Sequence, residues 1–338
     1  MNKNNKLLNG FEVAVKAAHD VGAEMMYGYP ITPTSEVFSH WINLGYNFLQ
    51  TEDEIAAGFC VCGAILAGQK AFTATAGPGH VLMQDSLSMA EGMRLPFVAI
   101  VGMRGGPSSG TVIYSQQEVT LACYGGNGEG FRFVYSPSNL EELYTLTVKA
   151  FNDAWLYKFP AILLTDGYLL KSKGIFEDTK TENIVKAEPL VVPGANVHLP
   201  SIYTLEEELY SAIQKHKTDY KEASKNIIMV EEYNMDEADT VIVAHGIVAA
   251  SAKSAIDTMK KKGKEIGLFR PITLRPFGAK QLNDMVKNKK KLIIIESSYG
   301  QLEKIVKDNL DLQNTIDIDT MQRPGLGIEP QDIISNIK

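Results

Sequence analysis

Residues 27–36 read YGYPITPTSE, and residues 50–59 read QTEDEIAAGF. The first stretch has the composition of a strand end broken by prolines, and the second opens an apolar helix rich in alanine and glycine. Glu54 stands at the head of that helix, where a carboxyl group is suited to exchange a proton with a ligand. A simpler role is also open, because Asp53 or Glu54 can cap the helix and interact favourably with its dipole. The local sequence does not choose between the two roles.

Strand-length and helix-length patterns alternate on both sides of this stretch. We predict strands within residues 22–30, 47–50, 70–79, 95–103, 131–136 and 160–167, and helices over 35–44, 53–67, 81–93 and 140–157. The run LPFVAIVGM is almost entirely apolar, as expected of a strand buried on both faces of a parallel sheet. The helix at 53–67 should also be mostly buried, because Ile55, Phe59, Val61 and Ile65 lie among small residues. The alternation predicts an α/β fold, with helices on both faces of a parallel sheet.

The composition changes after residue 170. Residues 171–204 are polar, proline-containing and without clear periodicity, and we interpret them as a linker. A charged helix over 205–222 is expected to pack as an arm. A second alternating series has predicted strands at 240–246, 266–272, 291–298 and 315–321 and helices at 249–263 and 279–288. The predicted organisation is a first domain over 1–172, a linker with one helix over 173–235, and a second domain over 236–338.

Composition narrows the class of protein. The 338 residues carry a net charge of −7, which argues against a nucleic-acid surface. The basic run KNKKK at 287–291 fits a solvated turn. No apolar stretch approaches the ~18 residues that span a bilayer. The stretch MNKNNKLLNG lacks the apolar core of a secretory signal, so we expect a cytoplasmic protein.

The cysteines and histidines give no sign of a metal centre. Three cysteines provide neither a disulfide framework nor a CxxC pair, and Cys60 and Cys62 are expected to be core thiols. The six histidines show no metal-binding spacing such as HExxH, so no metal ligand is assigned to this chain. His80 attracts interest only because it adjoins a glycine-rich turn.

Two further segments are candidates for ligand contact. TATAGPGH at 73–80 runs from a strand into a Gly-Pro-Gly turn, so Thr75 and Gly77 lie where a ligand can approach the backbone closely. The same turn can simply join a strand to a helix. Arg104 follows the apolar strand at its carboxyl end, the edge at which open α/β sheets bind ligands. Its guanidinium suits a carboxylate, although a surface arginine in a mobile loop fits as well.

Together, YPITPTSE, EDEIAAGF, TATAGPG, MRGGPSSG and LTDG resemble the alpha subunit of 2-oxoacid:ferredoxin oxidoreductases. In the second half, ADTVIVAHG, GLFRPITLRPF and IIIESSYGQL resemble that subunit's transketolase C-terminal-like domain. Each motif is weak alone, but they occur in the family's order and with similar spacing over nearly the whole chain. The resemblance implies a thiamine-diphosphate pyrimidine-binding domain followed by a transketolase C-terminal-like α/β domain.

The resemblance also implies roles for individual residues. The acid matching Glu54 would hydrogen-bond the aminopyrimidine ring and promote deprotonation of the thiazolium carbon. Residues matching Thr32 and Arg104 would hold the carboxylate and keto group of the 2-oxoacid. The remaining cofactor contacts are expected from Tyr29, Pro30, Thr75 and Gly77. The family reaction is coenzyme A-dependent oxidative decarboxylation with electron transfer to ferredoxin, here most consistent with 2-oxoglutarate and alternatively with branched-chain 2-oxoisovalerate.

This chain resembles one half of a complete enzyme. It lacks a GDG motif followed by asparagine, which binds Mg²⁺ and diphosphate, and it lacks the cysteine spacing of an iron–sulfur site. A beta subunit is therefore expected to supply the diphosphate site, Mg²⁺ and a 4Fe–4S cluster, and gamma and delta subunits are further candidate partners. A transketolase-like transferase subunit and a non-enzymatic assembly protein are alternatives. The first would need basic or histidine contacts to a sugar phosphate, and the second would tolerate loss of Glu54.

Overall fold

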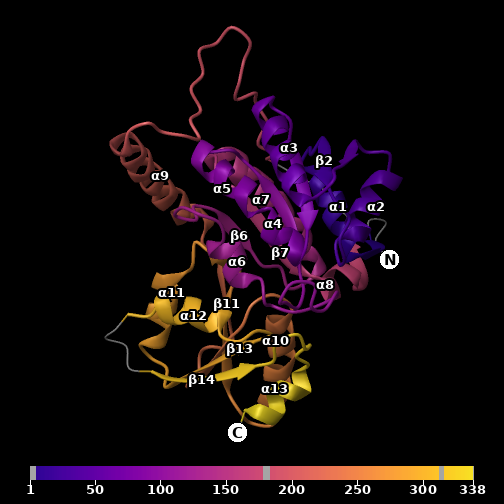
Figure 1. Cartoon of the computed structure of the whole chain (residues 1–338). Helices are drawn as coiled ribbons and strands as arrows, with labels where there is room; N and C mark the ends of the chain where they lie inside the picture. Colours follow the sequence, from indigo (N-terminus) through magenta and orange to yellow (C-terminus); the bar gives the residue numbers. More distant parts are fainter. Residues whose placement is uncertain (1–4, 178–182, 312–315, 338) are drawn as a thin grey trace.

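The larger body of the protein is built on a seven-stranded sheet (Figure 1). The computed structural model describes residues 5–177, 183–311 and 316–337. From one edge to the other the strands are β12 (Thr273–Arg275), β6 (Phe133–Tyr135), β7 (Ala161–Asp166), β5 (Val98–Met103), β4 (Ala71–Thr75), β2 (Met25–Gly28) and β3 (Phe48–Gln50). Only β12 runs antiparallel to its neighbour, so the other six strands end at a common edge.

Helices cover both faces of this sheet, as predicted. Alternate residues of each central strand point to opposite faces, so Phe72 and Ile100 enter one core while Ala71 and Val101 enter the other. One face is covered by α1 (Gly10–Asp20), α2 (Ser35–Asn43), α7 (Leu140–Tyr157) and α8 (Gly167–Lys171). The other is covered by α3 (Glu54–Leu66), α4 (Pro78–Leu82), α5 (Gln84–Met93) and α6 (Val119–Tyr124). Burial on both faces explains why these strands are almost wholly apolar.

A smaller second body carries a five-stranded sheet (Figure 1). Its order is β14 (Asp317–Gln322), β13 (Lys291–Glu296), β10 (Thr240–Val243), β11 (Ile266–Pro271) and β9 (Val230–Tyr233), with β9 antiparallel to β11. Its helices are α10 (Gly246–Lys260), α11 (Ala279–Val286), α12 (Gln301–Asp308) and α13 (Pro330–Asn336). The fold class predicted from the sequence, two α/β units with parallel sheets, is therefore confirmed.

The polar middle of the chain contains more regular structure than its sequence pattern indicates. β8 (Lys173–Glu177) pairs with β1 (Asn5–Asn9) as a separate two-stranded ribbon, and β9 joins the second sheet. Interpreting residues 171–204 wholly as linker was therefore wrong at the start of that segment. The ribbon is mostly exposed, so its residues do not show the alternating apolar pattern of a half-buried strand.

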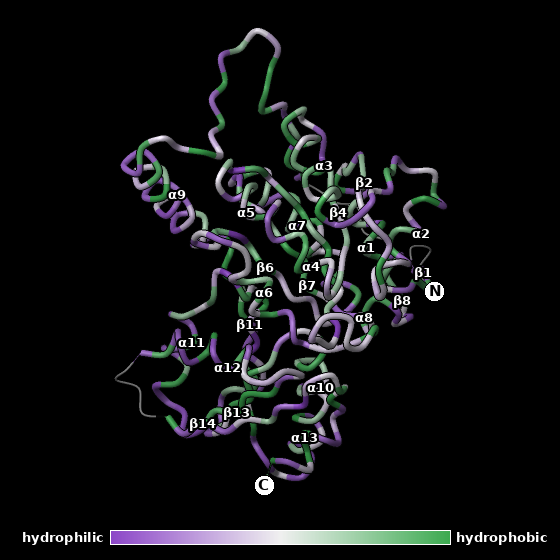
Figure 2. The backbone as a smooth tube through the Cα atoms, viewed as in Figure 1, coloured by the Kyte–Doolittle hydropathy of each residue, from purple (hydrophilic) through white to green (hydrophobic). Residues whose placement is uncertain are grey.

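The charged helix predicted over 205–222 is α9 (Glu206–Ile227), and it is longer than expected. Figure 2 shows hydrophilic residues along much of its length. It packs on the first body through Tyr220, Ala223 and Ile227, and the Tyr220 ring stacks on Phe133. Because only residues near its carboxyl end are buried, the helix as a whole is hydrophilic.

The predicted helix over 81–93 is two helices, because α4 ends and α5 begins around Met83. The 53–67 and 140–157 predictions match α3 and α7 closely. Within the described ranges, no helix is both long and apolar enough to cross a bilayer.

Candidate functional site

The predicted site residues come from neighbouring strand ends of the first sheet. They are Tyr29, Pro30 and Thr32 after β2, Glu54 after β3, Thr75 and Gly77 at the end of β4, and Arg104 after β5. Strands β3, β2, β4 and β5 are consecutive neighbours, so these loops emerge side by side. The carboxyl edge of a parallel sheet is where such folds bind ligands.

Glu54 is not the cap of α3. Asp53 takes that role, because its side chain accepts a hydrogen bond of 2.8 Å from the backbone N–H of Ala56. The Glu54 side chain is buried, with 6% exposure, and packs against the Gly-Pro-Gly turn. A Cβ added to Gly79 would lie 2.2 Å from Glu54 Oε1 and 2.3 Å from Thr75 Oγ1. The carboxyl group and the hydroxyl group therefore lie together beneath a residue that must be glycine.

Burial raises the pKa of Glu54, and the neighbouring carboxylate of Asp53 raises it further. The guanidinium of Arg104 acts in the opposite direction. The net effect is that Glu54 holds its proton more readily than an exposed glutamate does. A carboxyl group tuned in this direction can both donate and accept a proton at a ring nitrogen.

Thr75, which precedes the Gly-Pro-Gly turn, brings a hydroxyl group close to the Glu54 carboxyl group. Thr75 is fully buried, and its Oγ1 has no hydrogen-bond partner among the described residues. Gly77 has φ of +50°, and a Cβ there would lie 2.6 Å from Arg104 Nε. Both the backbone conformation and the close approach require glycine at position 77.

Arg104 is held by backbone carbonyl groups. Its Nη1 donates to the Thr32 carbonyl oxygen at 2.7 Å, and its Nη2 donates to the Ser109 carbonyl oxygen at 3.0 Å. Its Nε is buried and has no partner in the described part of the chain. The structure thus brings Arg104 and Thr32 together, but through the backbone of Thr32. Tyr29 and Pro30 lie further out and are exposed.

One buried acid of this region was not predicted as a site residue. Glu118 Oε1 accepts hydrogen bonds from the backbone N–H groups of Gly77 at 3.0 Å and Arg104 at 2.8 Å. Its Oε2 lies 2.8 Å from His80 Nδ1, which donates because a carboxylate only accepts. His80, which the sequence singled out, is therefore a partner of Glu118.

The outer side of α3 corrects the prediction that this helix is mostly buried. Ile55 and Phe59 are 38% and 36% exposed, and nearby Tyr29, Val81 and Leu82 are 42%, 57% and 43% exposed. These five residues, each more than a third exposed, are here called the α3–α4 face. Cys60 also lies partly exposed on α3, so only Cys62 is the core thiol that was expected.

A groove of about 670 Å³ lies elsewhere, between α5, the loop around Asn127 and the chain that enters α9. Neither Glu54 nor Arg104 lines it, so it is separate from the predicted site. In the described parts of the chain, no cluster of three or more His, Cys, Asp or Glu residues is placed to hold a metal ion.

Family models match nearly the whole chain. Residues 16–237 match "Pyruvate flavodoxin/ferredoxin oxidoreductase, thiamine diP-bdg", and residues 238–333 match "Pyruvate:ferredoxin oxidoreductase core domain II". The ketoisovalerate oxidoreductase subunit VorB of Methanothermobacter marburgensis is 32% identical, over 98% of this chain and 97% of that protein. The 2-oxoglutarate synthase subunit KorA of Methanocaldococcus jannaschii is 28% identical, over 88% and 89%.

Solved structures agree with the sequence relatives. A 2-oxoglutarate:ferredoxin oxidoreductase from Magnetococcus marinus, with 2-oxoglutarate, coenzyme A and succinyl-CoA bound, superposes with a TM-score of 0.90 at 25% identity. The match covers 99% of this chain and 65% of that solved chain, so this chain spans less than two thirds of it. A split-gene transketolase at 14% identity and TM-score 0.58 shares the fold.

Proposed function

The chain belongs to the pyruvate flavodoxin/ferredoxin oxidoreductase family, and on that premise we propose that it supplies the catalytic acid of an enzyme that oxidatively decarboxylates a 2-oxoacid. It is an alpha-type subunit of the 2-oxoacid:ferredoxin oxidoreductases. The observation that carries the proposal is that the carboxyl group of Glu54 is buried at the carboxyl edge of the sheet. This burial raises the pKa of Glu54. The proposed electron acceptor is ferredoxin, and coenzyme A takes the acyl group.

The residues at this edge fit the aminopyrimidine end of thiamine diphosphate. Thiamine diphosphate, when bound, supplies the carbon nucleophile that attacks a 2-oxo group. Glu54 would hold or release a proton at a ring nitrogen, and the Thr75 hydroxyl, which has no partner among the described residues, offers a second polar contact. Gly77 and Gly79 let the side chains of the site lie close to the backbone of the turn, because a Cβ at either position would collide with them. Tyr29 and Pro30 would border the ring from the exposed side.

Arg104 and Thr32 are proposed to bind the substrate. The Nε of Arg104 has no hydrogen-bond partner among the described residues, while its Nη1 donates to the Thr32 carbonyl oxygen and its Nη2 to that of Ser109. A cation held in this way is a preorganised partner for a carboxylate. The relatives support two 2-oxoacids. 2-Oxoglutarate is favoured by KorA and by the solved enzyme, while the match to VorB over 98% of the chain favours 2-oxoisovalerate.

A partner subunit is proposed to complete the site. The α3–α4 face exposes five large apolar side chains, two of them on the helix that Glu54 opens, and exposed apolar surface is typical of protein interfaces. We propose that a beta subunit covers this face and brings the diphosphate site, Mg²⁺ and a 4Fe–4S cluster. Gamma and delta subunits are further candidate partners.

The test is Glu54→Gln in the complex reconstituted with its partner subunit. We expect turnover of the preferred 2-oxoacid, followed by reduction of ferredoxin or a viologen dye, to fall by orders of magnitude, because glutamine cannot exchange the proton. The circular dichroism spectrum should remain that of the wild type. Assays with 2-oxoglutarate, 2-oxoisovalerate and pyruvate would identify the substrate. Full turnover by Glu54→Gln would remove the catalytic assignment.

A further inference from the structure

We propose that Glu118 is the positioning residue that holds the two ligand-binding loops of the site in register, and that the second body holds Glu118 in place. The catalytic part of this inference rests on the proposed function. Its structural part, the anchoring of the two loops, does not.

One oxygen atom of Glu118 joins two loops of the site. Glu118 Oε1 accepts from Gly77 N–H at 3.0 Å and from Arg104 N–H at 2.8 Å, and these residues follow the adjacent strands β4 and β5. A single acceptor shared by two backbone groups fixes the separation of the two loops. The separation matters because Gly77 lies directly against the Arg104 side chain.

The Glu118 carboxyl group is also buried and hydrogen-bonded through both of its oxygen atoms. Glu118 is 5% exposed, and its other oxygen accepts from His80 Nδ1 at 2.8 Å. His80 is fully buried in α4, so the carboxylate also ties that helix to the loops. Hydrogen bonds in a buried site of low dielectric are electrostatically stronger than hydrogen bonds in water. Removing the side chain would leave three buried donors without their acceptor.

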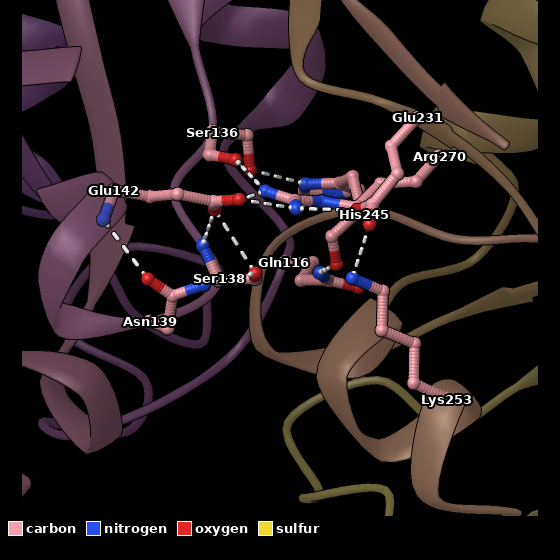
Figure 3. A network of polar contacts seen from close by, with 9 residues as sticks. All are labelled: Gln116, Ser136, Ser138, Asn139, Glu142, Glu231, His245, Lys253 and Arg270. Carbon is pink, nitrogen blue, oxygen red and sulfur yellow. Dashed lines mark hydrogen bonds and ion pairs between the residues drawn. The ribbon is translucent and has the colours of Figure 1, made fainter. Parts of the chain in front are cut away.

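The residues next to Glu118 in the sequence are hydrogen-bonded to the second body. Ser115 Oγ and the Gln116 N–H both donate to the Ser297 carbonyl oxygen, at 2.9 and 3.0 Å. The Gln116 side chain accepts from Ser297 N–H at 3.0 Å. It also donates to the His245 carbonyl oxygen at 3.1 Å (Figure 3).

Gln301, at the start of α12, completes the anchor from the other side of Glu118. It donates to the Gln117 carbonyl oxygen at 2.8 Å and accepts from Thr120 N–H at 2.9 Å. The segment 115–120 is therefore a bridge: the second body holds it on both sides of Glu118, and the Glu118 side chain contacts the two loops of the site.

A different part of the same junction offers a matched control. Ser136 Oγ lies 2.9 Å from His245 Nδ1, on the side of the junction shown with Arg270 in Figure 3. Ser136 is fully buried, like the bridge, but makes no hydrogen bond to segment 115–120. Ser136→Ala should therefore lower stability without disturbing the loops.

The decisive experiment compares Glu118→Ala, Glu118→Gln and Ser136→Ala by hydrogen exchange and by kinetics. In Glu118→Ala we expect the amides of Gly77 and Arg104 to exchange at least tenfold faster, because their acceptor is gone. In the reconstituted enzyme, kcat/KM for the 2-oxoacid should fall at least tenfold. Glu118→Gln keeps a carbonyl acceptor for both N–H groups and should stay within a few-fold of wild type on both measures. Ser136→Ala should leave both measures unchanged.

Gln301→Leu tests the bridge without touching Glu118, and it decides the matter if Glu118→Ala does not fold. Faster exchange at Gly77 and Arg104 in this variant would support the bridge. Wild-type exchange and kinetics in both Glu118→Ala and Gln301→Leu, or in Gln301→Leu alone if Glu118→Ala does not fold, would overturn the proposal. If the wild-type complex turns over no 2-oxoacid, the proposed function fails, while the hydrogen-exchange result still decides the role of Glu118.

Discussion

The positions of Glu54 and Arg104 in the fold could be predicted from the sequence, whereas that of Glu118 could not. The sequence positions of Glu54 and Arg104 predict their place at the sheet edge, which the structure confirms, because an acid that opens a helix and an arginine that ends an apolar strand both belong there. Their roles toward a ligand stay predictions. Glu118 could not be found in this way. Its partners Arg104 and Gly77 lie 14 and 41 residues away, and the surrounding TVIYSQQE has no distinguishing pattern. A hydrogen bond between loops leaves no periodic signal in one sequence.

Arg104→Ala should impair use of the 2-oxoacid more than it impairs the fold. The variant loses the proposed carboxylate partner and also frees the Thr32 carbonyl oxygen that Arg104 holds at 2.7 Å. We expect kcat/KM for the 2-oxoacid to fall by about 10²-fold, in the range typical of removing a preorganised charged group. Steady-state kinetics of the reconstituted complex measure this. Unchanged kinetics would contradict the substrate role, and Arg104→Lys should recover only part of the loss.

Glu54→Gln should stabilise the isolated subunit. The pKa of Glu54 is raised in the folded chain, chiefly by burial, so folding opposes its ionisation. The contribution of this group to stability is therefore fully present below the unfolded pKa and is lost as the pH rises through the raised value. Glutamine does not ionise, so the variant should melt at a higher temperature than wild type at pH 8, and the gap should close towards pH 4. Thermal unfolding at both pH values, without thiamine diphosphate, tests this.

For the helix α3, the sequence predicted the element itself but not the exposure of its side chains. Its existence and its bounds were predicted closely, because an apolar run with an acidic first turn is a strong helix signal. The exposure of its side chains was not predicted. The sequence of one chain does not distinguish an apolar side chain that packs in the chain's own core from one that lies on the surface. Gly58 meets α5 so closely that a Cβ would lie 1.9 Å from Ser86 Oγ, while Ile55 and Phe59 face outward.

Cys60 provides a direct probe of this outward side. It is partly exposed, whereas Cys62 and Cys123 are buried and burial raises the pKa of each of those thiols to about 12. In the isolated subunit a maleimide should therefore modify Cys60 first, because the thiolate is the reactive form. Addition of the partner subunit should slow that reaction at least tenfold. Peptide mass spectrometry measures the labelling, and equal rates with and without partner would argue against α3 as the interface.

At the scale of the whole molecule, a buried ionic junction joins the two bodies. Arg270 of β11 is fully buried; its Nη1 donates to Glu142 of α7 at 2.7 Å and to Glu231 of β9 at 3.0 Å (Figure 3). Burial and the nearby Arg270 charge lower the pKa of His245 to about 3, so that histidine stays neutral. The α/β class of both halves was predictable from alternation. This junction was not, because it depends on which strand ends meet, and the domain boundary near 235 stays a prediction.

Glu142→Gln should destabilise the fold in a pH-dependent way. Burial alone would raise the pKa of Glu142, but hydrogen bonds from Arg270 and Ser138 hold it below the ordinary value of 4.5. Its contribution to stability is thus present above the unfolded pKa and lost as the pH falls through the lowered value. At pH 7 we expect a loss of about 2 kcal/mol, because Arg270 is buried but Glu142 is partly exposed and Glu231 still faces Arg270. Urea unfolding should show this loss at pH 7 and a smaller loss at pH 3.

The strand β12 has a practical consequence for anyone who would cut this polypeptide into parts. It lies beyond the first family model, which ends at residue 237, yet it pairs with β6 as the edge of the seven-stranded sheet. A fragment truncated at that point would expose the hydrogen-bonding groups of β6 to solvent and to other fragments. Such an open border invites aggregation. Recombination between relatives should therefore succeed more often when both halves are inherited from the same parent.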